Sequence, residues 1–257
     1  MNYGFHLSTA GAITGMRRLD TIANNLANSN TVGFKADVLS LSARLPENLE
    51  KPGAYQDTNR LLDALGGGSL FHPAAIDLRQ GSLRQTGGAL DIAIEGEGFL
   101  RLATPAGQKD ALLTRAGALA RDGAGHLVLA TSGATVLSTS GAPIVLDADD
   151  PDVEIDAQGR VYQSGEEIAR LAVVVPADAS SLRKEGKDAF RLPGGRVQEA
   201  PASTRVRQGQ LEESTVDPVL ALAELVKVSR GIEFSTRLMQ FQDQMTGRLI
   251  DTFGRFA

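Results

Sequence analysis

The chain has 257 residues, of which 42% are hydrophobic and 5% aromatic, with 28 glycines and no cysteine. This length allows one large or two smaller folded domains, the glycines favour many turns between short strands, and the lack of cysteine excludes disulfides and thiolate chemistry. The net charge of −5 is concentrated in the middle, because residues 1–35 carry +2 and residues 218–257 carry +1, and an acidic middle argues against nucleic acid or an anionic membrane as partner.

The first segment predicts a long amphipathic helix. Its apolar and small residues recur at spacings of four and three, which is the pattern of a heptad seam. The seam residues are Phe5, Thr9, Ala12, Met16, Leu19, Ala23 and Leu26, with Ile13 and Ile22 beside them. Because several are small or polar, a helix of about 25 residues with this seam is marginal alone in water, and we expect it to be frayed or disordered in the free chain.

This helix is expected to end near Asn28, where asparagine and serine side chains compete for backbone hydrogen bonds. Gly33 then allows a positive φ, and Phe34 is expected to anchor the turn. Amides at Asn24, Asn25 and Asn28 that satisfy one another across a helix interface would fix its register. The alternative is an ordinary polar helix end.

Residues 36–75 show weak periodicity and many breaks, including three consecutive glycines at residues 66–68. They predict an extended connector with at most a short helix at Arg60–Leu65.

Residues 76–205 predict strands and turns. Runs at Leu90–Ile94 and Phe99–Leu102 flank a glycine-rich turn, and hairpin turns are predicted at Asp122-Gly123 and Asp156–Gly159. The apolar run Leu171–Val175 predicts a buried strand. Many short strands favour an antiparallel sandwich or a partly open barrel, so the fold class is α+β and mainly β, with long helices at both ends.

The last helix has a clear predicted start, since Asp217 is a suitable N-cap and Pro218 a suitable first residue. It is expected to reach about Thr252, or about 50 Å. Its predicted apolar face, with a change of phase near Gly231, consists of Leu222, Leu225, Val226, Phe234, Leu238, Phe241, Met245 and Leu249.

No chemical motif stands out. The three histidines lack metal-ligand spacing, and the acidic run around Asp150 lacks the pattern of a calcium loop, which favours a solvated turn. Gly96-Glu97-Gly98 lies between predicted strands rather than before a helix, as a phosphate loop would, and no Gly-x-Ser-x-Gly elbow occurs. The sequence therefore predicts no catalytic residue, no cofactor and no metal site.

Several segments resemble the signatures of bacterial flagellar rod and hook proteins. The N-terminal match is Ile22-Ala23-Asn24-Asn25-Leu26-Ala27-Asn28 with Thr31-x-Gly33-Phe34-Lys35. Further matches lie at residues 81–86, 90–99, 114–117 and 122–128 in the middle, and at residues 206–214 and 230–233 near the end. The resemblance covers nearly the whole chain except about residues 36–75, while Thr215, where the family commonly has asparagine, and Gly231 depart from the pattern.

The resemblance implies an axial subunit of a flagellar basal body, with terminal helices that pair in an inner tubular layer and a β domain that faces outward. It implies four parts: residues 1–35 as axial helix and turn, 36–75 as connector, 76–205 as outer domain, and 206–257 as second axial helix. The chain lacks room for the extra domain usual in hook subunits, which favours the rod, and its start Met1–Gly4 with its unusual connector favours the proximal rod.

The implied partners are further copies, other rod and hook proteins and the flagellar export apparatus, without nucleic acid or direct membrane insertion. The chain has no evident cleaved signal and no apolar run of about 18 residues. These features alone favour the cytoplasm, whereas the resemblance implies export without cleavage into the periplasmic rod.

The predicted assembly interface draws on both ends of the chain. Its residues are Met16, Leu19, Ile22, Asn24, Asn25, Leu26, Asn28, Thr31, Gly33, Phe34, Lys35, Leu222, Val226, Arg230, Glu233, Phe234, Leu238, Phe241 and Met245. The alternative from another functional class is a secreted hydrolase or carbohydrate-binding β domain, for which Asp91 and Glu95 are the acids to test.

Overall fold

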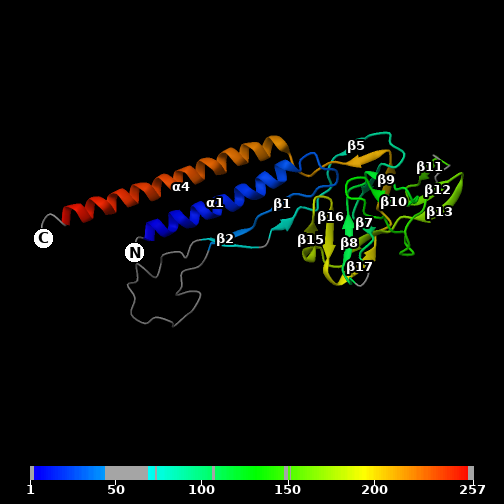
Figure 1. Ribbon diagram of the computed structural model, residues 1–257, viewed down its shortest axis with the longest axis horizontal. Coiled ribbons are helices and arrows are strands. Elements are labelled where there is room, and N and C mark those ends of the chain that lie inside the picture. The colour runs from blue at the N-terminus through cyan, green and yellow to red at the C-terminus, as the bar shows by residue number, and fades with distance from the viewer. Residues whose placement is uncertain are drawn as a thin grey trace. The chain divides into compact units, whose positions relative to one another are not determined.

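A computed structural model describes residues 3–43, 69–72, 74–105, 108–147, 150 and 152–253. Two long helices, α1 (Tyr3–Ala27) and α4 (Pro218–Phe253), stand at the ends of the described chain (Figure 1). The predicted end of the first helix before Asn28 and the predicted start of the last at Pro218 are both confirmed. Within the described residues, no helix is long and apolar enough to cross a membrane.

The two helices pack side by side in antiparallel directions, because Gly4 contacts Gln242, Gly11 contacts Ser235, and Gly15 contacts Ile232 (Figure 1). On α4, the partly or fully buried residues recur at heptad spacing at Ala221, Leu225, Val228, Ile232, Ser235, Met239, Gln242 and Thr246. On α1, glycines line the contact and allow close approach. The pair is thus made by the two helices of one chain, and the expectation that the first helix is frayed or disordered in the free chain stays a prediction.

The packed faces differ from the strongest apolar stripes. Phe5 and Met16 are 44% and 53% exposed, and Phe234 on α4 is 63% exposed. The contact on α1 instead includes the small residues Ala12, which is 4% exposed, and Gly15, which lies against Ile232. Small side chains let the backbones approach closely, so dispersion contacts favour this face over the bulkier one.

Gly15 is expected to be essential for this pairing. A Cβ atom at Gly15 would lie 2.7 Å from Cγ1 of Ile232, so Gly15→Ala should lower the free energy of unfolding of the helix pair by about 2 kcal/mol, more than the gain in helix propensity. Gly11→Ala is the matched control, because its Cβ would lie 3.5 Å from Ser235 Oγ in ordinary contact. Thermal unfolding followed by circular dichroism measures both, and equal stability of the two variants would contradict the packing.

Residues 36–75 are more ordered at their ends than an extended connector. Strand β1 (Asp37–Val38) pairs with β4 (Ala75–Ile76), and β2 (Leu41–Ala43) pairs antiparallel with β3 (Ser69–Phe71). The two ends of this segment therefore meet. The short helix predicted at Arg60–Leu65 lies outside the described residues.

The remaining strands form antiparallel sheets. The largest has six strands in the order β15-β16-β8-β7-β14-β17, and smaller sheets pair β11-β12-β13, β9-β10, β18-β6 and β19-β5. The bounds are β5 Leu83–Gln85, β6 Ile92–Glu95, β7 Phe99–Leu102, β8 Ala111–Thr114, β9 Leu119–Arg121, β10 Leu127–Leu129, β11 Val153–Ile155, β12 Arg160–Gln163, β13 Glu166–Arg170, β14 Val173–Pro176, β15 Arg183–Glu185, β16 Ala189–Leu192, β17 Val197–Glu199, β18 Arg205–Gln208 and β19 Gln210–Glu212. Short 3₁₀ turns at Ala179–Ser181 and Pro193–Gly195 connect strands.

The predicted local structure of this region is largely confirmed. The turn at Asp122-Gly123 joins β9 to β10, and that at Asp156–Gly159 joins β11 to β12. The buried strand predicted at Leu171–Val175 begins later, at Val173, and its residues are half-buried, while the buried residues Leu171 and Ala172 precede it. The fold is α+β and mainly β, as predicted.

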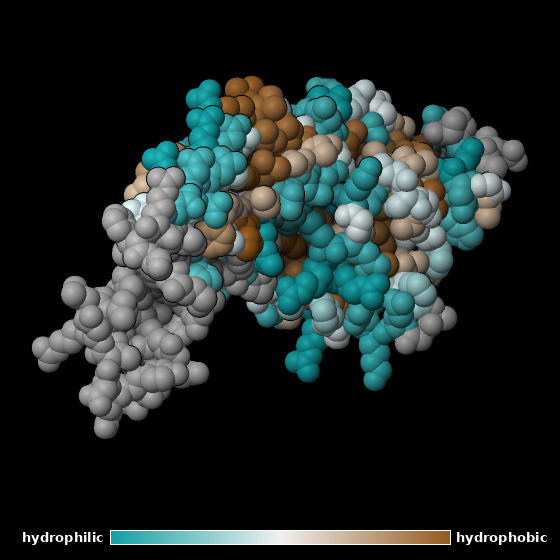
Figure 2. Space-filling view, turned by 60° about the vertical axis from the view of Figure 1, so that its left-hand side comes forward, coloured by the Kyte–Doolittle hydropathy of each residue, from teal (hydrophilic) through white to brown (hydrophobic). Residues whose placement is uncertain are grey.

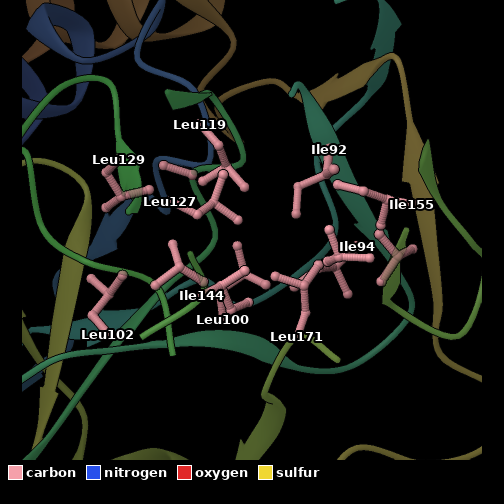
Figure 3. Packing of buried hydrophobic residues seen from close by; sticks show 14 of the residues in the cluster. Ile92, Ile94, Leu100, Leu102, Leu119, Leu127, Leu129, Ile144, Ile155 and Leu171 are labelled. Carbon is pink, nitrogen blue, oxygen red and sulfur yellow. The ribbon is translucent and has the colours of Figure 1, made fainter. Parts of the chain in front are cut away.

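The core of this β region is a cluster of aliphatic side chains from different sheets (Figure 3). Ile92 and Ile94 from β6 point toward Ile155 and Leu171, and Leu100 from β7 lies near Ile144 (Figure 3). A second cluster forms around Phe99 and Phe190, whose rings meet edge to face with centroids 5.5 Å apart.

The chain divides into two compact units. The first consists of residues 1–26, 37–75 and 218–257, and the second of residues 27–36 and 76–217. The second unit thus includes Ala27 at the end of α1, the nine residues that follow it, and the strands that precede α4.

Candidate assembly interface

Both helices expose large apolar side chains. Figure 2 shows hydrophobic residues gathered in patches on one face of the molecule. On α1 these are Phe5, Leu7, Ile13 and Met16, and on α4 they are Val219, Leu220, Leu222, Val226, Phe234, Leu238, Phe241, Met245 and Leu249. Exposed apolar side chains that gather on one surface usually mark a protein contact. The predicted interface residues of α4 are thus accessible, and Arg230 and Glu233 beside them are exposed as well.

The predicted interface residues of α1 have mixed placements. Met16 and Asn24 are exposed, while Leu19, Asn25 and Leu26 are half-buried and Ile22 is buried. The side chain of Asn25 is engaged within the chain: its Nδ2 donates to the carbonyl of Asp37 and its Oδ1 accepts from the amide of Asp37, both at 2.9 Å. Asn25 therefore fixes the start of β1 relative to α1.

The signature turn, residues 31–35, follows α1. The amide of Thr31 donates to the carbonyl of Asn28 at 3.1 Å, its hydroxyl donates to Asn28 Oδ1 at 3.2 Å, and the amide of Phe34 donates to the carbonyl of Thr31 at 3.2 Å. Gly33 has a φ of 68°, and a Cβ there would lie 2.4 Å from the carbonyl carbon of Arg115. Glycine alone tolerates both the positive φ and the close approach of the Arg115 backbone.

The signature turn is hydrogen bonded to the segment before α4. The amide of Gly33 donates to the carbonyl of Glu212 at 2.8 Å, and the amide of Thr215 donates to the carbonyl of Phe34 at 3.1 Å. The hydroxyl of Thr215 accepts from the amide of Ala36 at 2.9 Å. We call these two joined segments, residues 31–36 and 211–215, the neck.

A buried ion network lies in the neck. Lys35 and Glu212 are fully buried, and Lys35 Nζ lies 2.6 Å from both Glu212 Oε1 and the carbonyl of Arg79. Arg115 Nη1 lies 3.1 Å from Glu212 Oε2, and Arg115 Nη2 donates to the carbonyl of Gly96 at 2.6 Å. Burial lowers the pKa of Lys35, and the attraction of Glu212 opposes that shift. The carboxylate of Glu212 thus pairs with two buried cations, Lys35 and Arg115.

Phe34 is also buried in this second unit. It is 2% exposed, and Lys184 Nζ lies 4.0 Å from the centre of its ring, which is a cation–π contact. The structure thus places Gly33, Phe34 and Lys35 inside a folded unit, and their part in the assembly interface stays a prediction.

Sequence reasoning missed Arg115 and Glu212 as functional residues. Both fall in segments that resemble the family, but neither belongs to a periodic pattern that marks it as buried. The one local signal is that Glu212 follows the apolar Leu211 in a strand-like run. Its partner Lys35 is 177 residues away, a separation that no local pattern spans.

The acids of the enzyme alternative are engaged locally. Asp91 Oδ2 accepts from the hydroxyl of Thr86 at 2.6 Å, and Glu95 forms an ion pair with Arg207 at 2.7 Å. Among the described residues, no group of three or more metal-ligating side chains occurs.

A pocket of about 360 Å³ lies in the β region, beside Arg170 and Glu199, which form an ion pair at 3.6 Å. The other described residues that line it are Thr139, Ala157, Gln158, Leu171, Val173, Ala200, Pro201, Ala202, Thr204 and Val206. Glu199 is the one carboxylate in this described lining, whereas glycoside hydrolysis uses a pair.

Three family models match the chain. Residues 9–35 match "Flagella basal body rod protein", residues 93–163 match "Flagellar hook protein FlgE/F/G D1 domain", and residues 207–252 match "Flagellar basal body rod FlgEFG protein C-terminal". The first and last of these matches contain the two segments that form the neck, apart from Ala36. The match in the middle covers most of the aliphatic core.

Full-length relatives are similar over the same range. The chain is 30% identical over 258 residues to the flagellar basal-body rod protein FlgF of Rhizobium meliloti, and 27% identical over 255 residues to FlgF of Caulobacter vibrioides, with 99% of each chain covered in both cases. It is 28% identical to the rod protein FlgG of Borreliella burgdorferi, with 93% of this chain and 94% of the relative covered.

Proposed function

This chain belongs to the family of flagellar basal-body rod proteins, and we propose from that membership that it is a structural subunit of the rod, the axial drive shaft of the flagellum. The single observation that carries the proposal is the helix pair with its many exposed apolar side chains. Burying one such side chain stabilises a contact by about 1.5–3 kcal/mol. A row of them provides the energy for assembly.

The two units suit two roles in a rod. The α1–α4 pair supplies the inner axial contacts, and the β region, with its polar outer strands, faces outward. The proposed division by role assigns residues 1–35 and 206–257 to the axial parts, residues 36–75 to the connector and residues 76–205 to the outer domain, and it differs from the two compact units in placing residues 27–35 and 206–217 with the helices. The buried ion network keeps the chain segments next to both helices joined, so torque that passes through the helices does not separate the strands of the neck.

The partners in this proposal are other copies of the chain and other rod and hook proteins. Export proceeds through the flagellar secretion apparatus without a cleaved signal, and the assembled subunit resides in the periplasmic part of the basal body. The subunit works without catalysis, nucleic acid or direct membrane insertion. Support comes from the rod proteins among its relatives and from the acids Asp91 and Glu95, which are bound to neighbouring side chains.

The resemblance to FlgF supports a place in the proximal rod. The test is a small tag inserted at Gly165, an exposed turn between β12 and β13 with open space around it. In basal bodies isolated from swimming cells that carry only the tagged chain, cryo-microscopy is expected to show the tag on the proximal rod. A tag on the hook, or basal bodies without any tag, would contradict the proposal.

A further inference from the structure

The helix pair carries two separate apolar stripes. At about 100° per residue, Phe5, Ile13 and Met16 fall within about 80° of one another on α1, and we call them the α1 stripe. On the second half of α4, the α4 stripe falls within about 60°. It consists of Phe234, Leu238, Phe241 and Met245, all of which are exposed.

These two stripes lie on opposite sides of the helix pair. Thr9, in the middle of the α1 stripe, contacts Met239 along one edge of the seam, with Oγ1 and Sδ 3.4 Å apart. Arg18 pairs with Glu224 along the other edge. On the helical wheel of α4, the α4 stripe lies next to Glu224. Its nearest residue is about 100° away from Met239, so the stripe lies on the edge of the seam where Arg18 pairs with Glu224. Each broad side of the pair therefore presents one stripe.

The two stripes also cover the same length of the pair. The antiparallel contacts place Gly4 opposite Gln242 and Gly15 opposite Ile232. By the same register, Phe5 is level with Phe241 and Ile13 with Phe234. The α1 stripe of a second copy therefore has the same length along the helix axis as the α4 stripe of the first copy.

We propose that the occupant of each stripe is a second copy of this chain, with the α1 stripe of one copy packed on the α4 stripe of the next at the same height. This inference rests on the proposed function and specifies its contact. A contact between unlike faces leaves a free stripe on each outer side, so copies continue to add, whereas packing like on like would close a dimer. It would also leave the other stripe, with Phe234 and Phe241 or with Phe5, exposed to water.

Gly231 fits this arrangement. A Cβ there would meet nothing within 4 Å in the single chain, so packing within the chain does not require glycine, and glycine in a helix is unfavourable. Gly231 lies seven residues before Leu238 and extends the α4 stripe. In the stated register it is level with Met16 of the next copy, and the missing side chain leaves room for that methionine.

The absence of cysteine makes the contact testable by disulfide formation in purified full-length chain. A chain with both Ile13→Cys and Phe234→Cys is expected to give a ladder of linked dimers, trimers and larger species on oxidation. Each single variant is expected to stay monomeric, because unlike faces meet. Dimers from a single variant, or no ladder from the double variant at protein concentrations where unmodified chain assembles, would overturn the proposal.

Two glycine variants sharpen the test. Gly231→Ala, placed in the double-cysteine chain, should raise the melting temperature of the free chain yet lower the yield of the ladder about tenfold or more, because a methyl group fills the space for Met16. Gly247→Ala is the matched control: its Cβ also meets nothing within 4 Å, but it lies off the stripe, so the ladder should persist. Equal ladders from the two variants would overturn the stated register.

The outcome is separable from that of the tag experiment. A tag on the rod without a ladder would keep the rod function and reject contact between copies of this chain. A ladder without a tag on the rod would keep the contact and reject the rod function.

Discussion

Replacing Glu212 with alanine is expected to lower the free energy of unfolding of the β region by about 3–5 kcal/mol. The side chain is fully buried and binds both Lys35 and Arg115, and its Oε1 also accepts from the amide of Gly81 at 2.9 Å. Without the carboxylate, two cations remain in a site that excludes water, and no other described anion contacts them both. Urea denaturation followed by circular dichroism measures the loss.

The neighbouring residue supplies the control. Glu213 pairs with Arg84 at 3.1 Å, but both side chains are about half exposed, so Glu213→Ala should change stability by less than about 1 kcal/mol. A similar loss in both variants would show that the buried network contributes no more than a surface ion pair. Because Glu212 joins strands on both sides of the neck, cells that carry Glu212→Ala should also swim poorly.

The second large effect is expected from the α4 stripe. A chain with Phe234→Asp and Phe241→Asp should fold with a stability within about 0.5 kcal/mol of the original, because both rings are exposed, yet it should fail to restore swimming to cells that lack the subunit. Each ring removed takes away about 1.5–3 kcal/mol of contact on assembly, and each carboxylate adds a charge to an apolar interface. Swimming on soft agar and the melting temperature of the purified chain give the two results.

The control places the same charges elsewhere on the same helix. Gln240→Asp and Gln244→Asp change two exposed residues that lie outside the α4 stripe, and swimming should persist. Normal swimming by the Phe234 and Phe241 variant would remove these rings from the assembly contact, whereas loss of swimming in both pairs would point to a general effect of charge on α4.

The helices and many turns could be predicted because their signals are local. Pro218 marks the start of α4, and the asparagines after Ala27 mark the end of α1. Turns such as Asp156–Gly159 follow from the preference of aspartate and glycine for tight turns. Each of these features depends on a few neighbouring residues, which the sequence displays directly.

The face that each helix buries could not be predicted in the same way. The sequence favoured a seam through Phe5 and Met16, because bulky apolar residues usually face a partner. In the structure Ala12 and Gly15 are part of the contact with α4, whereas Phe5 and Met16 remain exposed. Which stripe a helix buries within its own chain depends on the shape of the partner helix, and a helix of an assembling protein needs a second stripe for its neighbours.

The candidate site was predicted in part. Phe34, Gly33 and Lys35 were identified from the motif that contains them, but their partners Arg115 and Glu212 come from segments far away in sequence. Sheet pairing between distant strands such as β5 and β19 brings them together. The proposed interface residues themselves remain predictions until assembly is measured.

The neck has a consequence for the modular evolution of such subunits. Since the amide of Gly33 meets the carbonyl of Glu212 and the amide of Thr215 meets the carbonyl of Phe34, the long stretch of chain between them leaves and returns at one point. A guest domain of any size whose two termini lie close together can be spliced in there without stretching the backbone that leads to either helix. The domain between the two segments of the neck can therefore be exchanged while the two terminal helices are kept.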